Sequence, residues 1–393
     1  MMKDVKSRMG MEEKELYLRT GYYLVELIRA VLTETTPGPM PARVTAEALY
    51  QIAKKHSVDC IAYEGAKKIP GDVLGTIDVK WAKRSTQCAM QGIVQLAERN
   101  KLYQTFSKAG IRILPLKGCL IKEMYPRQEF RQMADMDILI DPENAKAAKK
   151  LMEEAGYELE GGVLGRWVHD EYVKKPWCSV ELHNAFLPAH NRNAKAYDDI
   201  WERAYEENPG SGIYVLTWDD FYIYILEHFA KHLRKNGSGI RSIMDIYIFN
   251  QYKGDQLNQD YLKKQLKKQD LWDFKENVEL IAEAWFEKGI TGVSKETEDL
   301  IILSGAYGTE LLHYQQEQKQ LNKKYRSKTI VKFIWLWKKV FKNMDFMTYS
   351  YPILKKCPFL LPFCWIHRIF KIVFKERSKI TKNINIIKRA EKE

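Results

Sequence analysis

Two aspartates separated by one residue, Asp135 and Asp137, stand directly before the apolar run 138–140. The run predicts a strand, and side chains two residues apart on a strand point to the same face of the sheet. We therefore expect the two carboxylates to converge on one spot. Mg²⁺ takes hard oxygen ligands from one or two carboxylates and completes its shell with water and phosphate oxygens. The aspartate pair thus predicts a site for divalent cations.

A lysine and a glycine follow the short, mostly apolar segment 111–116 and precede a predicted helix at 119–124. We interpret this order as strand, tight turn and helix. Gly118 would let the backbone approach a ligand closely, and the helix N-terminus would offer N–H groups to an anion. Lys117 adds a positive charge, and Arg131 carries a fork of donors suited to phosphate. These residues together predict a phosphate-binding site.

The order of strand, small-residue turn, helix and Asp-x-Asp strand resembles the nucleotidyltransferase superfamily, which has the DNA polymerase beta-like fold. Leu-Lys-Gly at 116–118, Tyr-Pro at 125–126, Arg131 and Asp-Met-Asp-Ile-Leu-Ile at 135–140 resemble more closely its bacterial branch of uncharacterised nucleotidyltransferases. The resemblance implies an α+β fold, with a small mixed-sheet core flanked by N-terminal and C-terminal helical regions. It also implies a nucleoside triphosphate substrate and two Mg²⁺ ions.

One position departs from the superfamily pattern. The Gly-Ser turn of the superfamily is replaced here by the sequence Lys-Gly-Cys at 117–119. The serine that would bind phosphate is missing. We therefore assign the phosphate-binding role to the backbone of the turn, to Lys117 and to Arg131.

A third acid, Glu181, lies on the predicted strand 179–183. The resemblance implies that it sits beside the aspartate pair on a neighbouring strand, where it ligates the second metal or takes a proton from the attacking hydroxyl. His183 would share that face, although a structural, hydrogen-bonded histidine is an equally good interpretation. Asp170 and Glu171 lie on a nearby segment and are alternatives for the third acid.

Helical periodicity dominates the flanks of this core. Apolar residues recur at helical spacing over 11–32, 46–56 and 81–109, and Pro and Gly at 37–39 mark a linker after the first of these segments. The glycine- and aromatic-containing segment 156–175 predicts two further strands. We divide the chain into a helical module at 1–110, a catalytic core at 111–218, a helical subdomain at 219–322 and a basic, aromatic-rich tail at 323–393.

The helical subdomain carries polar residues that could act on the substrate. His228 and His232 are four residues apart on the predicted helix 221–235 and share one face. The glutamate of an H-E-x-x-H zinc site is not between them, so zinc is a minority interpretation. Asp245 lies on the following helix, and the resemblance includes it together with both histidines. These residues are candidates for holding the metal ligands in place or lining the acceptor pocket, and a plain polar network between helices is the alternative.

The charge is concentrated in the tail. Residues 323–393 contain 19 Lys and Arg against 4 Asp and Glu, whereas the rest of the chain contains 44 against 47. No apolar stretch of the tail reaches the ~18–20 residues of a membrane-spanning helix. Because tryptophan and phenylalanine are interleaved with lysine, we favour an anionic membrane surface as its partner. Nucleic acid binding and packing within the chain are the alternatives.

Cysteine usage and the first residues indicate the compartment. The six cysteines are widely spaced without a C-x-x-C pair, and residues 1–14 are polar and charged rather than a signal peptide. We therefore expect free thiols in the reducing cytoplasm, with possible peripheral attachment at the inner face of the membrane.

Two classes of function compete. The first is a Mg²⁺-dependent nucleotidyltransferase that moves a nucleoside monophosphate from a triphosphate to a hydroxyl group of a small-molecule or sugar acceptor. The second is a non-catalytic nucleotide-binding or scaffold protein of the same fold, attached peripherally to a membrane. Retention of three acids favours the enzyme. A nucleic-acid acceptor is disfavoured because the mildly acidic body would repel a long polyanion.

Overall fold

The computed structural model describes residues 10–160, 169–187 and 193–308, then 314, 317–318, 321–322, 325, 327–342 and 344–375. The chain divides into two compact units. One consists of Leu16–Lys231 and Ser238–Ala306, and the other of Met1–Glu15, His232–Gly237 and Tyr307–Glu393. Each unit is described by itself below. The four-part division expected from the sequence stays a prediction.

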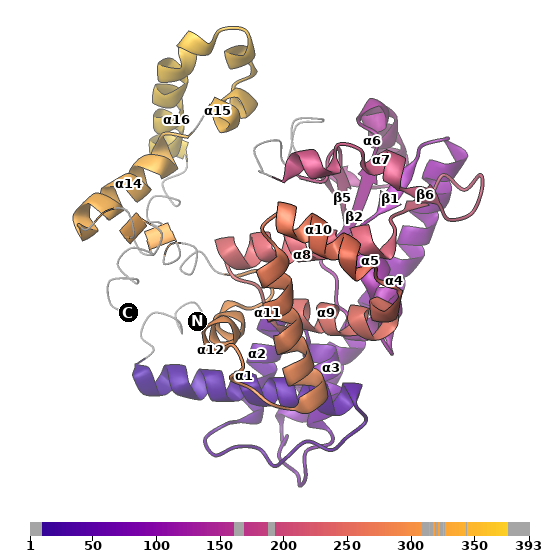
Figure 1. The fold of residues 1–393 in the computed structure, drawn as a ribbon, viewed down its shortest axis with the longest axis vertical. Coiled ribbons are helices and arrows are strands. Elements are labelled where there is room, and N and C mark those ends of the chain that lie inside the picture. Colours follow the sequence, from indigo (N-terminus) through magenta and orange to yellow (C-terminus); the bar gives the residue numbers. More distant parts are fainter. Residues whose placement is uncertain are drawn as a thin grey trace. The chain divides into compact units, whose positions relative to one another are not determined.

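Four helices precede the sheet, and three of them lie over the segments that the periodicity predicts, whereas the helix at 59–66 was not expected. They are α1 (Met11–Leu32), α2 (Ala46–His56), α3 (Asp59–Ala66) and α4 (Ile77–Lys108). The start of α2 is fixed by Thr45, whose hydroxyl accepts a hydrogen bond from the backbone N–H of Ala48, and its end by Ser57 in the left-handed conformation. Figure 1 shows α1, α2 and α3 gathered in the lower part of the drawing, apart from the strands.

A five-stranded mixed sheet forms the core, with the order β1-β2-β5-β4-β3. Strand β2 pairs parallel with β5, and the other neighbouring pairs are antiparallel. The α+β fold with a small mixed sheet between helical regions is thereby confirmed. The strands are β1 (Ile113–Pro115), β2 (Met136–Ile140), β3 (Glu158–Leu159), β4 (His169–Lys174) and β5 (Cys178–His183).

One face of this sheet is covered by α4 and α6 (Ala145–Glu154). Alternate residues of the strands, such as Ile138 and Val180, pack there with Phe106 of α4 and Met152 of α6 in a buried apolar cluster. Since neighbouring residues on a strand point to opposite faces, the intervening positions 137 and 181 lie on the other face. The apolar cluster therefore fixes which side of the sheet carries the acidic residues.

The remaining elements of this unit are mostly helical. Helix α8 contains the predicted helix 221–235, and α9 is the following helix, which carries Asp245. The described elements are α5 (Gly118–Ile121), α7 (Ile200–Arg203), β6 (Tyr205–Glu206), β7 (Tyr214–Val215), α8 (Trp218–Lys235), α9 (Ile240–Lys253), α10 (Gln259–Lys268), α11 (Trp272–Glu283) and α12 (Lys295–Ser304).

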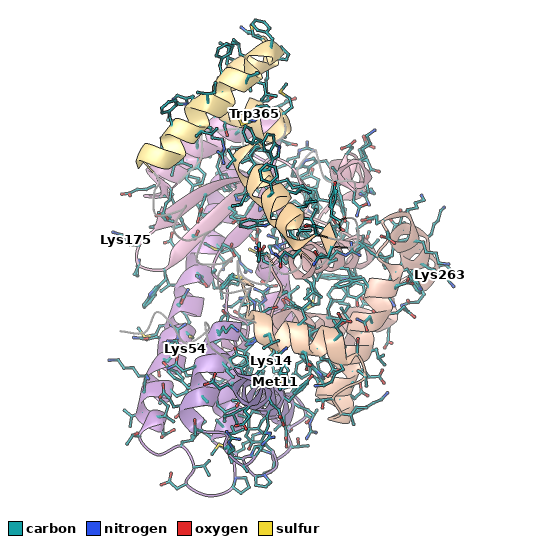
Figure 2. The ribbon with its side chains drawn as sticks, turned by 90° about the vertical axis from the view of Figure 1, so that its left-hand side faces the viewer. Met11, Lys14, Lys54, Lys175, Lys263 and Trp365 are labelled. Atoms are coloured by element: carbon teal, nitrogen blue, oxygen red, sulfur yellow. The ribbon has the colours of Figure 1, made fainter. Side chains whose placement is uncertain are left out.

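The C-terminal unit contains α14 (Lys328–Val340), α15 (Met344–Ser350) and α16 (Leu361–Lys375). Met347 of α15 and Cys364 of α16 pack with Leu354, from the segment between these two helices, in a small core. Trp365 of α16 donates a hydrogen bond from its indole nitrogen to the carbonyl oxygen of Lys342 at 3.0 Å (Figure 2). Among the described residues, no helix combines the length and the apolar character that crossing a membrane requires.

Candidate active site

The strand register brings the predicted acids together. Asp137 of β2 lies directly opposite Glu181 in the parallel pairing with β5, and the next position on the same face of β5 is His183. The antiparallel partner β4 places His169 opposite His183 and Glu171 opposite Glu181. Directly paired residues of neighbouring strands project from the same face of the sheet. One sheet face therefore carries a band of acidic and imidazole side chains.

Asp137 is the centre of this band. It is 3% exposed, and its Oδ1 accepts hydrogen bonds from Lys117 Nζ and from His183 Nε2, the latter at 2.8 Å. Burial alone would raise the pKa of the carboxyl group, but the charge of Lys117 and the bond from His183 outweigh it. The pKa of Asp137 therefore lies well below its usual range, and the side chain is an anion at neutral pH.

Lys117 is held against Asp137 by the backbone of the turn before α5. The N–H of Leu116 donates to the carbonyl oxygen of Asp137 at 3.0 Å, which ties the turn to β2. Lys117 itself has a φ of 44°, a left-handed conformation that non-glycine residues rarely adopt. Burial opposes the charge of its ammonium group, yet the attraction of Asp137 raises its pKa above the usual range. The predicted phosphate-binding lysine thus forms an ion pair with the predicted metal ligand.

Gly118 is needed for space. A Cβ at this position would collide with Arg131 Nη1 and would lie 2.8 Å from Met133 Sδ. The backbone N–H groups of Cys119 and Leu120 donate to the carbonyl oxygens of residues 116 and 117. The expectation that this helix start offers its N–H groups to phosphate is wrong for these two groups, because the tight turn already uses them. The assignment of Gly118 to phosphate binding stays a prediction.

Asp135 stands just before β2 and is partly buried. Its pKa is raised to about 6, first by burial and then by repulsion from the carboxylates of Asp137 and Glu181. Three acidic groups are therefore close enough to disfavour one another's ionisation. A bound cation would relieve this repulsion, since it stabilises the anionic form of each carboxyl group.

Glu181 is the third acid, and two histidines flank it. Its Oε2 lies 3.3 Å from His183 Nε2, and its Oε1 lies 3.6 Å from His169 Nε2. Burial tends to raise the pKa of Glu181, but the interaction with His183 lowers it overall. Burial likewise opposes the charge of His183, while its hydrogen bond to Asp137 and its interaction with Glu181 raise its pKa. Burial lowers the pKa of His169.

Our sequence interpretation did not include His169. The signal was present, because His169 and Glu171 alternate on one strand, as Glu181 and His183 do on the next. Pairing the two strands as an antiparallel hairpin brings the two histidines opposite each other. Their ring centroids are 5.0 Å apart.

Arg131 and Asp245, placed by the sequence in separate roles, form a buried ion pair. Arg131 donates from Nε and Nη2 to the two carboxylate oxygens of Asp245 at 3.1 and 2.9 Å. The hydroxyl of Tyr125 donates to the same carboxylate at 2.6 Å. Burial opposes the guanidinium charge, but Asp245 outweighs it and raises the pKa of Arg131 above its usual range. The ion pair connects the segment before Asp135 to α9. Phosphate binding by Arg131 stays a prediction.

The two histidines of α8 belong to different compact units, His228 to the larger and His232 to the smaller. The ring of His228 lies 6.3 Å from that of Tyr224. Tyr224 is buried beside the site: burial raises its pKa, while the positive charge of Lys117 lowers it. Within the described residues, the three side chains gathered as potential metal ligands are His169, Glu181 and His183 rather than the two histidines of α8.

The sequence of residues 42–287 matches the model of a protein family described as an uncharacterised nucleotidyltransferase. The matched region is more than half of the chain and contains the whole five-stranded sheet. Searches among curated proteins and among solved structures returned no match. The match agrees with the resemblance carried by the Lys-Gly turn and the Asp-x-Asp strand. The chain therefore belongs to this uncharacterised nucleotidyltransferase family.

Proposed function

We propose that the protein transfers a nucleoside monophosphate from a nucleoside triphosphate to a hydroxyl group of a small acceptor. The observation that carries this proposal is the β2–β5 register, which sets Asp137 directly opposite Glu181, with Asp135 two positions before Asp137 along the chain. A cation bound there would stabilise the anionic form of the carboxyl groups further, and most of all that of Asp135, whose pKa is raised to about 6. The family match supplies the reaction class.

The donor set fits Mg²⁺. Asp135, Asp137 and Glu181 provide carboxylate oxygens, and Mg²⁺ prefers such hard ligands and completes its shell with water and phosphate. Bound there, two Mg²⁺ ions would neutralise the phosphates and the charge that develops during an in-line displacement. The chain's own residues hold these ligands in place: the β2–β5 register aligns Asp137 with Glu181.

Lys117 has the role of a phosphate-binding residue in this proposal. Its ammonium group carries a positive charge at neutral pH, since Asp137 raises its pKa. A triphosphate brings several anionic oxygens to the same region, and an ammonium group binds phosphate as a point charge. Glu181, whose pKa is lowered, stays anionic and accepts a hydrogen bond from the attacking hydroxyl of the acceptor.

The proposed acceptor is a small molecule or a sugar. Outside the tail the chain is mildly acidic, with 44 basic and 47 acidic residues before position 323. This balance disfavours a long nucleic acid beside the site. Helix α8 adds aromatic side chains near the acids, with Tyr224 packed at 4.6 Å between ring centroids against Phe186. The alternative is a scaffold that binds nucleotide without turnover, and the three retained acids argue against it.

The test is calorimetric titration of each of the four ribonucleoside triphosphates, with and without Mg²⁺, followed by measurement of pyrophosphate release with candidate acceptors. We expect Mg²⁺-dependent binding that is lost in Asp137→Asn. The matched control is Asp72→Asn, at an exposed position outside the site. Equal Mg²⁺-dependent affinity in Asp137→Asn and the wild type would refute the site. Binding without any pyrophosphate release would favour the scaffold.

We also propose that the C-terminal unit attaches the protein peripherally to anionic membrane. The supporting observation is a stripe of exposed apolar side chains on and just before α16: Phe359, Phe363, Ile366 and Phe370, with exposed fractions of 74, 68, 52 and 57%. Phe363, Ile366 and Phe370, spaced by three and four residues, lie on one face of α16, and Phe359 lies in the turn just before it. Helix α14 exposes Phe333 and Trp337 in the same way. Apolar rings and lysines on one segment match the chemistry of an anionic lipid surface.

Co-sedimentation with vesicles tests this attachment. The double variant Phe363→Ser and Phe370→Ser should bind vesicles of phosphatidylglycerol and phosphatidylcholine at least about tenfold more weakly, because each buried phenylalanine contributes roughly 1.5–3 kcal/mol. The control Ile93→Ser removes an apolar side chain that is 70% exposed on α4, and it should leave binding unchanged. Equal vesicle binding by the double variant would rule out the membrane role of this stripe.

A further inference from the structure

Beside the aspartate pair, the sheet face opposite α4 and α6 carries a second set of ligand atoms, and this set contains nitrogen. His169 of β4 and Glu181 and His183 of β5 each offer one atom, and these atoms lie within 4.8 Å of one another. The three residues come from two adjacent antiparallel strands. Their relative positions are therefore fixed by backbone hydrogen bonds rather than by loops.

The spacing of these atoms suits a coordinated ion. A four-coordinate metal with bonds of about 2.0–2.1 Å holds its ligand atoms about 3.3–3.4 Å apart. The two histidine-to-glutamate distances end on different oxygens of Glu181: His183 Nε2 lies 3.3 Å from Oε2, and His169 Nε2 lies 3.6 Å from Oε1. A small movement of the partly exposed His169 ring, whose side chain is 39% exposed, would complete this geometry.

The position of the His183 ring also indicates a cation. Its Nε2 faces two carboxylate oxygens at once, Asp137 Oδ1 at 2.8 Å and Glu181 Oε2 at 3.3 Å. A ring nitrogen carries at most one proton, so it can direct a well-aligned hydrogen bond to only one of these oxygens. A metal ion bound between this nitrogen and Glu181 Oε2, which lies 3.3 Å from it, would interact favourably with both.

We propose that His169, Glu181 and His183 form a seat for a divalent transition-metal ion, of the series from Mn²⁺ to Zn²⁺, next to the oxygen-only aspartate pair. Imidazole nitrogen favours such ions, whereas Mg²⁺ favours oxygen ligands. This site rests on the proposed function, because Glu181 is a ligand shared with the aspartate pair. It extends that function by giving the two cation sites different chemistry. One position suits Mg²⁺, and the other selects against it.

The experiment uses the full-length protein and Zn²⁺ or Co²⁺ alone, without nucleotide. We expect Zn²⁺ to bind with one equivalent at this seat, at least about tenfold more tightly than Mg²⁺. Bound Co²⁺ should give the visible absorption of a site with nitrogen ligands and low coordination number. The variant His169→Gln should lower the Zn²⁺ affinity at least about tenfold. His367→Gln is the matched control, since this exposed histidine lies in the other compact unit.

Several results would overturn the seat. Equal Zn²⁺ affinity in His169→Gln and the wild type would do so, and so would Mg²⁺ binding as tightly as Zn²⁺. The Co²⁺ spectrum of the wild-type protein tests the seat even if a variant fails to fold: a weak spectrum typical of six oxygen ligands refutes it. Failure here is distinguishable from failure of the proposed function. Mg²⁺-dependent triphosphate binding that survives without a Zn²⁺ site rejects the seat alone.

Discussion

The buried pair of Arg131 and Asp245 gives the sharpest test of how the site is supported. Replacing Asp245 by Asn keeps the shape of the side chain and removes its charge. The Arg131 guanidinium, 8% exposed, then stays buried with no anion opposite it. Breaking a buried ion pair by removing one partner costs about 3–5 kcal/mol. The amide oxygen of Asn can still accept one hydrogen bond, so we expect a loss of about 3 kcal/mol in the free energy of unfolding.

Urea unfolding of the wild type and the variants measures this loss. The double variant Arg131→Met with Asp245→Leu removes both charges, and we expect it to recover most of the stability, because apolar residues of similar volume can replace a buried pair. The control is Glu154→Gln, which breaks an exposed pair with Lys150 whose side chains are 58 and 79% exposed. Exposed pairs contribute about 0–1 kcal/mol, so this variant should be close to the wild type.

The same experiment decides between two roles for Arg131. If the guanidinium serves the ion pair, Asp245→Asn loses stability, and its nucleotide affinity falls only as far as the folded fraction falls. If the guanidinium binds phosphate, as the sequence predicts, Arg131→Met lowers triphosphate affinity in protein that is still folded. A stability change under about 1 kcal/mol in Asp245→Asn, together with lost triphosphate binding, would refute the structural role of the pair.

Three further predictions follow from single groups. In protein without cations, the carboxyl group of Asp135 has a pKa of about 6 in the folded state and of 3.8 in the unfolded state, so the folded state binds its proton more tightly. The contribution of this group to the free energy of unfolding is therefore complete below about pH 4 and is lost as the pH rises to about 6. The pH dependence of unfolding of Asp135→Asn should lack this component. Gly118→Ala forces a Cβ against Arg131 and should cost about 1–3 kcal/mol in unfolding experiments, whereas the control Gly254→Ala, with its nearest neighbour at 3.8 Å, should cost little. Burial and the charge of Arg131 lower the pKa of Lys122 to about 8, so Lys122→Met should raise the free energy of unfolding at pH 7 by roughly 2 kcal/mol. This gain should shrink as pH rises above about 8 and the lysine loses its proton, and a gain that is constant with pH would contradict the assigned cause.

The sequence predicts much of the acidic site because the relevant rules are local. Alternation along one strand places Asp135 and Asp137 on one side, and alternation along another does the same for Glu181 and His183. Only one further fact was needed, namely that the two strands are neighbours, and the family resemblance supplied it. The apolar residues between these positions, such as Ile138, fix the orientation by packing on the helices behind the sheet.

Other features depend on partners that are distant in sequence. Arg131 and Asp245 are separated by 114 positions, so composition and spacing cannot show that one neutralises the other. The turn before α5 is a different case. Local rules assign the left-handed conformation to glycine, yet Lys117 adopts it, and Gly118 is instead required by the side chains packed against it. Tertiary contacts decide both points.

The ion pair between Lys117 and Asp137 has a consequence for the order of binding. Before any ligand arrives, the carboxylate already has an internal counter-ion, and a metal ion that binds Asp137 must compete with this ammonium group. A triphosphate that attracts the lysine weakens this competition, and a metal that displaces the lysine makes it available to the triphosphate. If the protein binds both ligands as proposed, each would strengthen the binding of the other by the same factor, since linkage between two binding events is reciprocal. The ion pair would therefore lower the affinity for either ligand when the other is absent.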